Sequence, residues 1–272
     1  MTLKQQEFID TVWVYYSRHG RHNLPWRLGV EDKDFPYHVL VSEVMLQQTQ
    51  VSRVIAKYAE WLMNFPTVES VANASFTECL RIWTGLGYNR RARFLHETCK
   101  QVQHNFNGNI PSDVTELVTL PGIGINTAGA ISVYGFNIPQ IFVETNIRTV
   151  YIKHFFESRQ AVTDTEIREE LTKTVDTEHP REWYWALMDY GSHLKRTQPT
   201  VNDQSAHYVK QSKFEGSRRQ VRSRVLKAIQ YKPQSFDDLA DHINDDRLAD
   251  VIAALEHEGF IHKTGVIYTI AT

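Results

Sequence analysis

Apolar residues recur at helical spacing along most of the chain and predict a mainly α-helical protein. Residues 4–19 are an example, because Phe8, Val12 and Tyr15 fall on one helical face. Further helices are expected over residues 37–50, 51–64, 67–72, 75–83, 94–106, 151–156, 164–175 and 182–194. Ser and Thr residues cap the short helices at 67–72 and 75–83. No alternation typical of strands interrupts this part, so we expect an all-α domain over residues 1–195.

The pattern changes after a polar segment at residues 196–217, which we expect to connect two domains. Three helices follow, the second capped by Ser235, and the chain closes with short alternating segments at 260–262 and 266–270. This order is typical of a winged helix. We therefore expect a small winged-helix-like α+β domain over residues 218–272.

Composition limits the kind of protein. The 272 residues suit two domains, and the formal net charge of −2 is not that of a generally basic DNA-coating protein. Cys79 and Cys99 are the two cysteines of the sequence, which excludes a disulfide framework or a four-cysteine metal site. We find no signal-like N-terminus and no apolar run long enough for a membrane span, so we expect a cytoplasmic protein without membrane association.

The most informative stretch runs from Leu120 to Val150. Its first part, Leu120-Pro121-Gly122-Ile123-Gly124, separates two helical patterns, and its glycines permit a tight turn ahead of a helix N-terminus suited to phosphate. An ordinary helix–helix turn is the alternative. Its second part places Glu144 between an apolar run and a helix, where a carboxylate is by default an N-cap or first-turn acid.

A second acidic residue, Glu43, lies within the apolar helix expected at 37–50. A solvent-exposed acid on an amphipathic helix is one interpretation. A helix this apolar is more consistent with burial on most sides, and burial would raise the pKa of the Glu43 carboxyl group.

These residues belong to spaced motifs that resemble the helix-hairpin-helix DNA glycosylases, and among them the adenine DNA glycosylases. The resemblance covers residues 20–195 in the family's order. Besides L-P-G-I-G and V-E-T-N, its motifs are Leu24-Pro25-Trp26-Arg27, Ser42-Glu43-Val44-Met45-Leu46-Gln47-Gln48-Thr49-Gln50, Trp83-Thr84-Gly85-Leu86-Gly87-Tyr88 and Ala186-Leu187-Met188-Asp189-Tyr190-Gly191. It implies a helix-hairpin-helix glycosylase fold that acts on double-stranded DNA with a mismatched or damaged base. We expect a monomer, associated with the nucleoid if the source is bacterial.

The resemblance also implies roles for residues. Glu43 and Glu144 would be catalytic, the first as a neutral acid that protonates the base and the second as an anion that stabilises the sugar cation. The expected base pocket comprises Trp26, Arg27, Asn126, Asn146 and Trp185. The expected DNA contacts are Gln47, Gln48, Thr49, Tyr88, Arg90, Arg91, Gly122 and Gly124. Backbone carbonyls of Val118, Leu120 and Ile123 are expected to hold K⁺ or Na⁺.

Four departures from the family pattern matter. Asn126 stands where bifunctional members carry lysine, and asparagine cannot form a Schiff base, so we expect no lyase step. Glu144 replaces an aspartate. The cysteines that bind an iron–sulfur cluster after the A-L-M-D motif are missing, so we expect no cluster. Trp185 replaces a Glu or Gln that reads adenine, and tryptophan cannot accept a hydrogen bond. The run Trp183-Tyr184-Trp185 is alternatively core.

The most basic part of the chain begins the second domain. Its residues are Lys210, Lys213, Arg218, Arg219, Arg222, Arg224 and Lys227. They predict a phosphate-binding strip, with Arg218, Arg219 and Arg222 as its DNA contacts, although a solvated helix face is the simpler interpretation. The third helix of this domain is acidic and would be repelled from a major groove, so we expect the domain to be a scaffold. It does not resemble the domain with which adenine glycosylases sense 8-oxoguanine.

Three functions are compatible with the sequence. The first is a monofunctional glycosylase that removes adenine opposite guanine or 8-oxoguanine, favoured by the S-E-V-M-L-Q-Q-T and G-L-G-Y motifs. The second is the same chemistry on mismatched thymine or uracil or a modified base, favoured by Trp185. The third is a non-catalytic DNA-damage binder, which the presence of both carboxylates disfavours.

Overall fold

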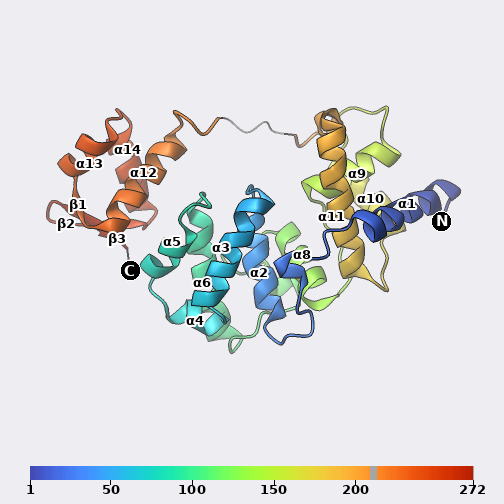
Figure 1. The fold of residues 1–272 in the computed structure, drawn as a ribbon, viewed down its shortest axis with the longest axis horizontal. Helices are drawn as coiled ribbons and strands as arrows, with labels where there is room; N and C mark the ends of the chain where they lie inside the picture. The colour runs from blue at the N-terminus through green and yellow to red at the C-terminus, as the bar shows by residue number, and fades with distance from the viewer. Residues whose placement is uncertain (209–212, 272) are drawn as a thin grey trace.

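The computed structural model describes residues 1–208 and 213–271. Three groups of elements lie in a row along the long axis of the molecule (Figure 1). One end holds α1, α9, α10 and α11, the middle holds α2 to α8, and the other end holds α12 to α14 with the small sheet. Within the described residues, no helix is both long and apolar enough to cross a bilayer.

The first half of the chain is helical, and the helices bury the apolar positions that predicted them. Its elements are α1 (Leu3–His19), η1 (Pro25–Arg27), α2 (Phe35–Leu46), α3 (Val51–Asn64), α4 (Val68–Asn73), α5 (Phe76–Trp83) and α6 (Arg90–Asn105). Thr67 and Ser75 cap α4 and α5 by accepting the backbone N–H groups of Ser70 and Glu78, as predicted. The predicted helix over 37–50 ends earlier, at Leu46, because Gln48 has a positive φ of 53°.

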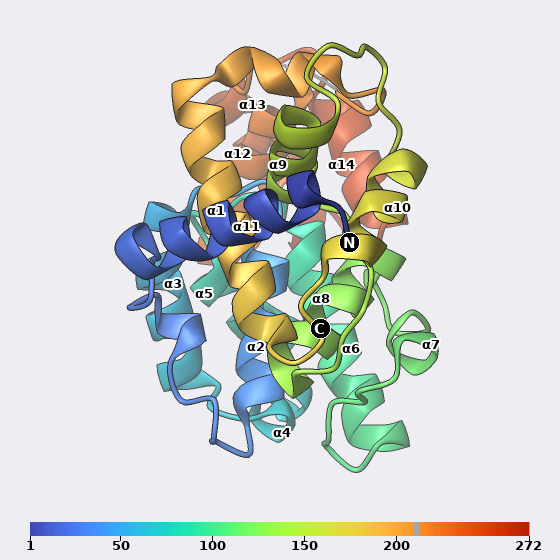
Figure 2. The same cartoon turned by 90° about the vertical axis from the view of Figure 1, so that its right-hand side faces the viewer.

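The rest of the all-α part returns to the first helix. Its elements are α7 (Val114–Leu117), α8 (Ile125–Phe136), α9 (Thr145–Phe155), α10 (Asp164–Thr174), α11 (Pro180–Thr197) and η2 (Pro199–Gln204). Helix α11 lies between α1 and α9, and Figure 2 shows α1 crossing it. Helix α9 begins six residues before the expected 151. The reason is that Ile147, Val150 and Tyr151 share one buried face at helical spacing.

The segment expected to connect the domains starts as packed structure. After α11, η2 packs against α9 and α11. Thr149 Oγ1 donates to Asn202 Oδ1 at 2.6 Å, and Val162 and Ser205 form an isolated parallel bridge. The first part of segment 196–217 therefore fastens the α9–α11 end of the molecule. Lys210 of the predicted basic strip lies outside the described residues.

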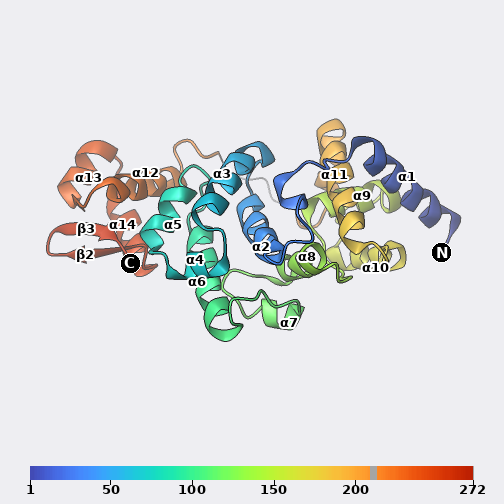
Figure 3. The ribbon, with the colours of Figure 1, turned by 60° about the horizontal axis from the view of Figure 1, so that its bottom comes forward.

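The C-terminal part has the order of a winged helix, with one strand that the sequence did not reveal. Its elements are α12 (Arg218–Tyr231), β1 (Gln234–Ser235), α13 (Phe236–Ile243), α14 (Leu248–His257), β2 (Ile261–Thr264) and β3 (Ile267–Ile270). All pairing is antiparallel in the order β1–β3–β2, with Ser235 opposite Ile267 and Ile261 opposite Ile270. Figure 3 shows this sheet beyond α5, at the end of the molecule opposite the N-terminus. The predicted fold class, mainly α with a small α+β domain, is confirmed.

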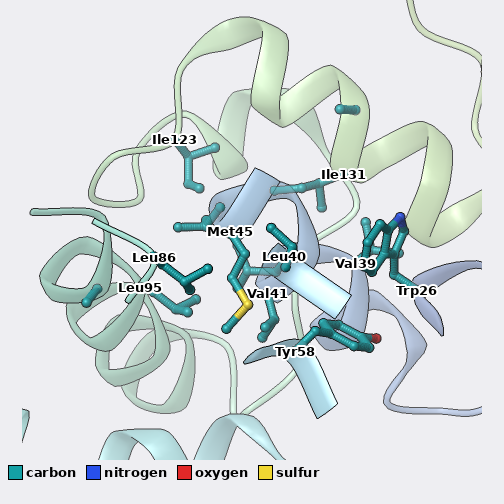
Figure 4. Packing of buried hydrophobic residues seen from close by; sticks show 14 of the residues in the cluster. Trp26, Val39, Leu40, Val41, Met45, Tyr58, Leu86, Leu95, Ile123 and Ile131 are labelled. Carbon is teal, nitrogen blue, oxygen red and sulfur yellow. The ribbon is translucent and has the colours of Figure 1, made fainter. Parts of the chain in front are cut away.

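Helix α2 occupies the centre of the core. Figure 4 shows Leu40, Val41 and Met45 of α2 surrounded by side chains from the neighbouring elements, including Ile131 of α8 and Leu95 of α6. Helices α2 and α8 are in extensive contact, and Gly135 of α8 lies against Pro36 at the start of α2. The two helices thus bring the stretch around Glu43 next to the hairpin that precedes α8.

Candidate active site

Glu43 is the partly exposed member of a buried stretch. Every other residue from 39 to 45 is buried, whereas Glu43 keeps intermediate exposure. Burial raises the pKa of the Glu43 carboxyl well above its usual value, the nearby charge of Glu144 raises it further, and Arg27 lowers it. The raised pKa favours the protonated form of the Glu43 carboxyl, which is the form that can donate a proton to a group that reaches it.

Glu144 precedes the first turn of α9 but does not cap it. Its backbone is extended at φ −112° and ψ 171°, and its side chain makes no capping hydrogen bond to the described residues of α9. Burial raises the pKa of this carboxyl to about 7, against the opposing charge of Arg148. Arg148 itself donates two hydrogen bonds to Asp164, at 2.7 and 2.9 Å. The carboxylate is thus left available for another purpose than helix capping.

The two carboxyl groups titrate as a pair. Burial raises the pKa of both, and each charge disfavours the ionisation of the other group, so the two protons leave the pair in separate steps. Two interacting carboxyls with separated pKa values suit a pairing of one acid with one anion.

The segment leading into Glu144 is tied down by three side chains. Asn126 Oδ1 accepts a hydrogen bond from Arg168 Nη2 at 2.8 Å and a longer one from the Val143 N–H at 3.5 Å. Arg168 Nη1 also donates to the Ile141 carbonyl at 3.0 Å, and the Tyr184 hydroxyl donates to the Gln140 carbonyl at 2.6 Å. Asn126, expected in the base pocket, therefore fixes the position of the segment that carries Glu144.

The loop of residues 24–27 is anchored to α11 by a buried ion pair. Both Nη atoms of Arg27 donate to the carboxylate of Asp189 at 2.9 Å, and Arg21 donates to the same carboxylate through its backbone N–H and Nε at 2.7 Å. Burial opposes ionisation of Asp189, but the hydrogen bonds and charges of the two arginines outweigh it and lower the pKa of this carboxyl. Trp26 is buried with its ring edge against Tyr58, 5.6 Å between centroids (Figure 4).

Trp185 lines the interior beside these groups. It is 9% exposed, lies parallel to the ring of Tyr134 with 6.3 Å between centroids, and is contacted by the Arg27 guanidinium at 5.2 Å. Its neighbours Trp183 and Tyr184 are fully buried, so the core interpretation holds for those two. The Trp185 indole thus belongs to the layer of side chains around Arg27.

Tyr134 is a residue that the sequence analysis missed. Its buried hydroxyl makes no hydrogen bond to any of the described residues. Burial, followed by the charges of Glu144 and Glu43, raises its pKa well above the usual value. The phenol therefore lies within electrostatic reach of both carboxyl groups. Within the apolar run of α8 it looked like core packing, and no sequence signal distinguished it.

Asn146 lies where α9 and α11 approach most closely. Its Nδ2 is 3.8 Å from Met188 Sδ, and its backbone oxygen is only 2.3 Å from the position that a Cβ on Gly191 would occupy. The glycine of A-L-M-D-Y-G is thus required for the contact that places the first turn of α9.

The hairpin between α7 and α8 contains two glycines with different surroundings. Gly122 has a φ of +74°, and a Cβ there would lie 2.6 Å from the side chain of Phe94. Gly124, the N-cap of α8, has a φ of −83° and open space around it. Of the carbonyls expected to bind a cation, that of Leu120 accepts the Ile123 N–H at 3.2 Å, and Val118 lies on the exposed side of the turn.

Many of the residues predicted to contact DNA line one cavity of about 1020 Å³ between the all-α part and α12. They are Gln47, Gln48, Tyr88, Arg90, Arg91, Gly122, Arg218, Arg219 and Arg222. Arg219 Nη1 donates to the Tyr88 hydroxyl at 2.7 Å, which joins the G-L-G-Y loop to α12. The structure thus gathers polar groups from three separate stretches of sequence. Gly124 and Thr49 are not among the residues that line it.

Arg91 is placed differently from the expectation of a phosphate contact. Its side chain is buried, and its guanidinium donates to the carbonyls of Val44, Met45 and Gln47 at 2.6 to 2.8 Å. It also bonds Thr49 Oγ1 at 3.0 Å. These are the carbonyls that the end of α2 leaves without helical partners. Arg91 therefore stabilises the C-terminus of the helix that carries Glu43.

The model of the HhH-GPD superfamily of base excision DNA repair proteins matches residues 41–177. The chain belongs to this superfamily. The match covers both carboxylates, the G-L-G-Y loop and the hairpin. It confirms the family that the motifs of the sequence indicated.

Two relatives show how far the similarity extends along the chain. An adenine DNA glycosylase of Buchnera aphidicola subsp. Baizongia pistaciae is 35% identical over 189 residues, which are 68% of this chain and 52% of that protein. The adenine DNA glycosylase of Homo sapiens is 42% identical over 148 residues, 53% of this chain and 27% of that protein. The chain thus matches about half of the length of the bacterial relative and less of the human one.

Solved structures support the HhH-GPD fold. A thermostable thymine-DNA glycosylase superposes with a TM-score of 0.60 at 22% identity, covering 70% of this chain and 86% of its own. A non-covalent endonuclease III–DNA complex gives a TM-score of 0.61 at 22% identity, covering 73% and 90%. At this identity the similarity concerns the fold.

Proposed function

We propose that this protein is a DNA glycosylase of base excision repair that hydrolyses the N-glycosidic bond of adenine mispaired with guanine or 8-oxoguanine. The observation that carries the proposal is the pair of partly buried carboxyl groups beside the hairpin, Glu43 and Glu144, which affect each other's ionisation and both have raised pKa values. The name shared by the relatives that match this region supports adenine as the base. Its substrate would be duplex DNA, with the protein acting as a monomer in the cytoplasm.

In the proposed reaction the target nucleotide leaves the base stack before chemistry starts. The protonated Glu43 carboxyl donates its proton to the base, which makes the base a better leaving group. The C–N bond then breaks, and its electrons stay with the base. The Glu144 carboxylate stabilises the positive charge that develops on the sugar, as paired carboxylates do in glycosidases. Water then adds to the sugar cation, its released proton passes to the Glu43 carboxylate, and an abasic site remains.

We infer a single hydrolytic step without a lyase reaction and without an iron–sulfur cluster. Asn126 has no amine for a Schiff base, and its carbonyl is already bonded to Arg168. Cys79 and Cys99 are buried in α5 and α6, and the sequence has no further cysteine to ligate a cluster. The purified protein should therefore be colourless and should form no covalent DNA complex on borohydride reduction. A borohydride-trapped complex would identify another amine as a nucleophile.

A second candidate is removal of another base, such as mismatched thymine or uracil or a modified base. The observation that favours it is Trp185, which offers a ring in place of a hydrogen-bond acceptor. A site that stacks a base but does not read its edge discriminates poorly among bases of similar size.

A cleavage panel tests the proposal and separates the candidates. Duplexes carrying each candidate base and mismatch are incubated with the protein, and alkali then cuts at abasic sites. Cutting at adenine opposite guanine or 8-oxoguanine is the expected result. Cutting at another base supports the second candidate. Duplexes that are bound but not cut would overturn the enzymatic proposal.

A further inference from the structure

The cavity between α12 and the all-α part is strongly basic. Among the described residues that line it, the cationic side chains greatly outnumber the acidic ones. The cations are Arg53, Arg90, Arg91, Arg218, Arg219, Arg222 and Lys227, and the acid is Glu258. The chain as a whole has a net charge of −2, so this concentration of positive charge is local. Such a groove suits a polyanion.

Glu258 is bonded to arginines on both walls of the groove. Its Oε1 lies 2.9 Å from Arg90 Nη2, at the start of α6. Its Oε2 lies 2.7 Å from Arg222 Nη2, on α12. Arg90 is 59% exposed, whereas Arg222 and Glu258 are each 23% exposed, so solvent reaches the cluster. One carboxylate therefore occupies two guanidinium groups that come from different domains.

The contact between the domains does not depend on this carboxylate alone. Phe260, just after Glu258, is buried with its ring 5.7 Å from that of Phe76, and Arg93 lies 5.5 Å from the Phe260 ring. The Arg93 guanidinium also donates to the backbone carbonyl of Glu258. These contacts fix the backbone of residue 258, while its side chain reaches into the groove. The carboxylate can therefore be displaced without separating the domains.

The Glu258 carboxylate presents its two oxygens to the two arginines as a bound phosphodiester would. Burial disfavours its ionised form, but its hydrogen bonds to Arg90 and Arg222 outweigh burial and lower the pKa of the carboxyl. The group is thus anionic at neutral pH, and it offers one oxygen to each arginine. A phosphodiester also carries one negative charge and two non-bridging oxygens that can accept from two guanidinium groups.

We propose that Arg90 and Arg222 form a binding site for a phosphodiester of the DNA backbone, and that Glu258 occupies this site until DNA displaces it. The sequence offered both arginines as DNA contacts. In addition, the two arginines act as one site built from both domains, and the Glu258 carboxylate competes with phosphate for this site. The proposal rests on DNA as the substrate, but not on the identity of the excised base.

Glu258 lowers the affinity of the protein for DNA because its negative charge repels an entering phosphate. In Glu258→Gln the amide keeps the shape of the side chain and removes the charge. Removing one like charge about 4 Å from a phosphate in a wet groove should tighten binding about fivefold. Glu256→Gln is the matched control. Glu256 lies on the same helix, is exposed and does not line the groove, so this variant should bind like the wild type.

The test measures affinity of the full chain for a short undamaged duplex over a series of salt concentrations. Because this duplex contains no lesion, the result is independent of whether the protein excises a base. Arg222→Gln and Arg90→Gln should each weaken binding and make the slope of log K against log salt shallower by about 1. Thermal melting of every variant confirms that the domains remain folded.

Two outcomes would overturn the proposal. In the first, Glu258→Gln binds the duplex no more tightly than Glu256→Gln, which would mean that the cluster only joins the domains. In the second, the arginine variants keep wild-type affinity and salt dependence, which would place the DNA elsewhere. If the protein cuts no duplex of the lesion panel but the variants keep the expected order of affinities for undamaged DNA, the proposed glycosylase function is contradicted. The phosphate site is then still supported.

Discussion

The charge of Glu144, which precedes α9, raises the pKa of the Glu43 carboxyl on α2. These two residues are separated by the hairpin in the sequence, and their partial burial affects both in the same direction. The relationship makes the protonation of each group depend on that of the other.

The rate of excision should depend on pH in a bell-shaped manner. The pKa of Glu144 is raised to about 7, so activity should rise as pH increases through 7 and Glu144 ionises. The pKa of Glu43 is also raised, so activity should fall again at the higher pH at which the pair loses its second proton. The pH profile of kcat/KM for the free enzyme measures both limits. A rate that is already maximal well below neutral pH would contradict the role of Glu144.

Glu43→Gln should lower excision by at least about 100-fold and leave DNA binding close to that of the wild type, because the amide has no acidic proton to transfer. It should also raise the melting temperature at pH 8. The pKa of Glu43 is higher in the folded protein than in the unfolded chain, so folding favours the protonated carboxyl. The contribution of Glu43 to the free energy of unfolding is therefore fully present below the unfolded pKa and is lost as pH rises. Single-turnover cleavage and thermal melting give the two measurements. Glu7→Gln, on the exposed face of α1, is the control. Excision within a few-fold of wild type would exclude Glu43 as the acid.

The two hairpin glycines should respond differently to alanine. Gly122→Ala should destabilise the protein by about 1–3 kcal/mol through its positive φ alone, and more through the contact with Phe94. Gly124→Ala should change stability by no more than about 0.5 kcal/mol, because its φ is ordinary and the space is open. If a DNA phosphate occupies that space, Gly124→Ala should still weaken DNA binding about tenfold. Urea unfolding and a binding titration distinguish the two effects, and wild-type affinity of Gly124→Ala would place the phosphate elsewhere.

Trp185→Gln should increase excision of adenine relative to other bases. The amide supplies the acceptor that the indole lacks, without adding a third carboxyl beside Glu43 and Glu144. The variant should melt at a lower temperature, since it loses the packing against Tyr134 and Arg27. Trp185→Phe is the matched control, because it keeps a ring and adds no acceptor. A folded Trp185→Gln protein with the base preference of Trp185→Phe would remove this position from the pocket.

Asp189→Asn should destabilise the protein by about 3–5 kcal/mol. The change would leave the buried guanidinium of Arg27 without its counter-charge, which costs more than the net stabilisation of the intact pair. The midpoint of urea unfolding measures the effect. Glu60→Gln removes the partly exposed ion pair with Lys57 and should cost at most about 1 kcal/mol. If Asp189→Asn and Glu60→Gln lower the free energy of unfolding by similar amounts, Asp189 does not anchor the loop of Arg27 to α11.

The sequence predicted the elements whose signals are local. Helical periodicity and the caps at Thr67 and Ser75 gave α3 to α5 to within a residue or two at each end, and the spaced motifs pointed to Glu43 and Glu144. Helix ends were less predictable where a distant side chain decides them. The end of α2 depends on Arg91, which comes from another helix.

The remaining site residues depend on contacts that no local pattern encodes. Tyr134 looked like one apolar residue among many, and Arg91 looked like part of an exposed basic triplet. Glu258 was one of the acids attributed to the third helix of the second domain, although its partner Arg90 lies in the other domain. In each case the role follows from what the folded chain places next to the residue, which burial and charge reveal only in three dimensions.

Helix α11 touches the site through three residues within two turns. Trp185 faces Arg27, Asp189 binds the loop of Arg27, and Gly191 admits the backbone of Asn146 beside Glu144. The same helix therefore positions Trp185, the loop of residues 24–27 and Glu144. Substitutions at these places should not act independently. Their effects on the rate, combined in double-mutant cycles, should deviate from additivity by more than about 0.5 kcal/mol even where the side chains do not touch. The active site would then respond to mutation as one cooperative unit.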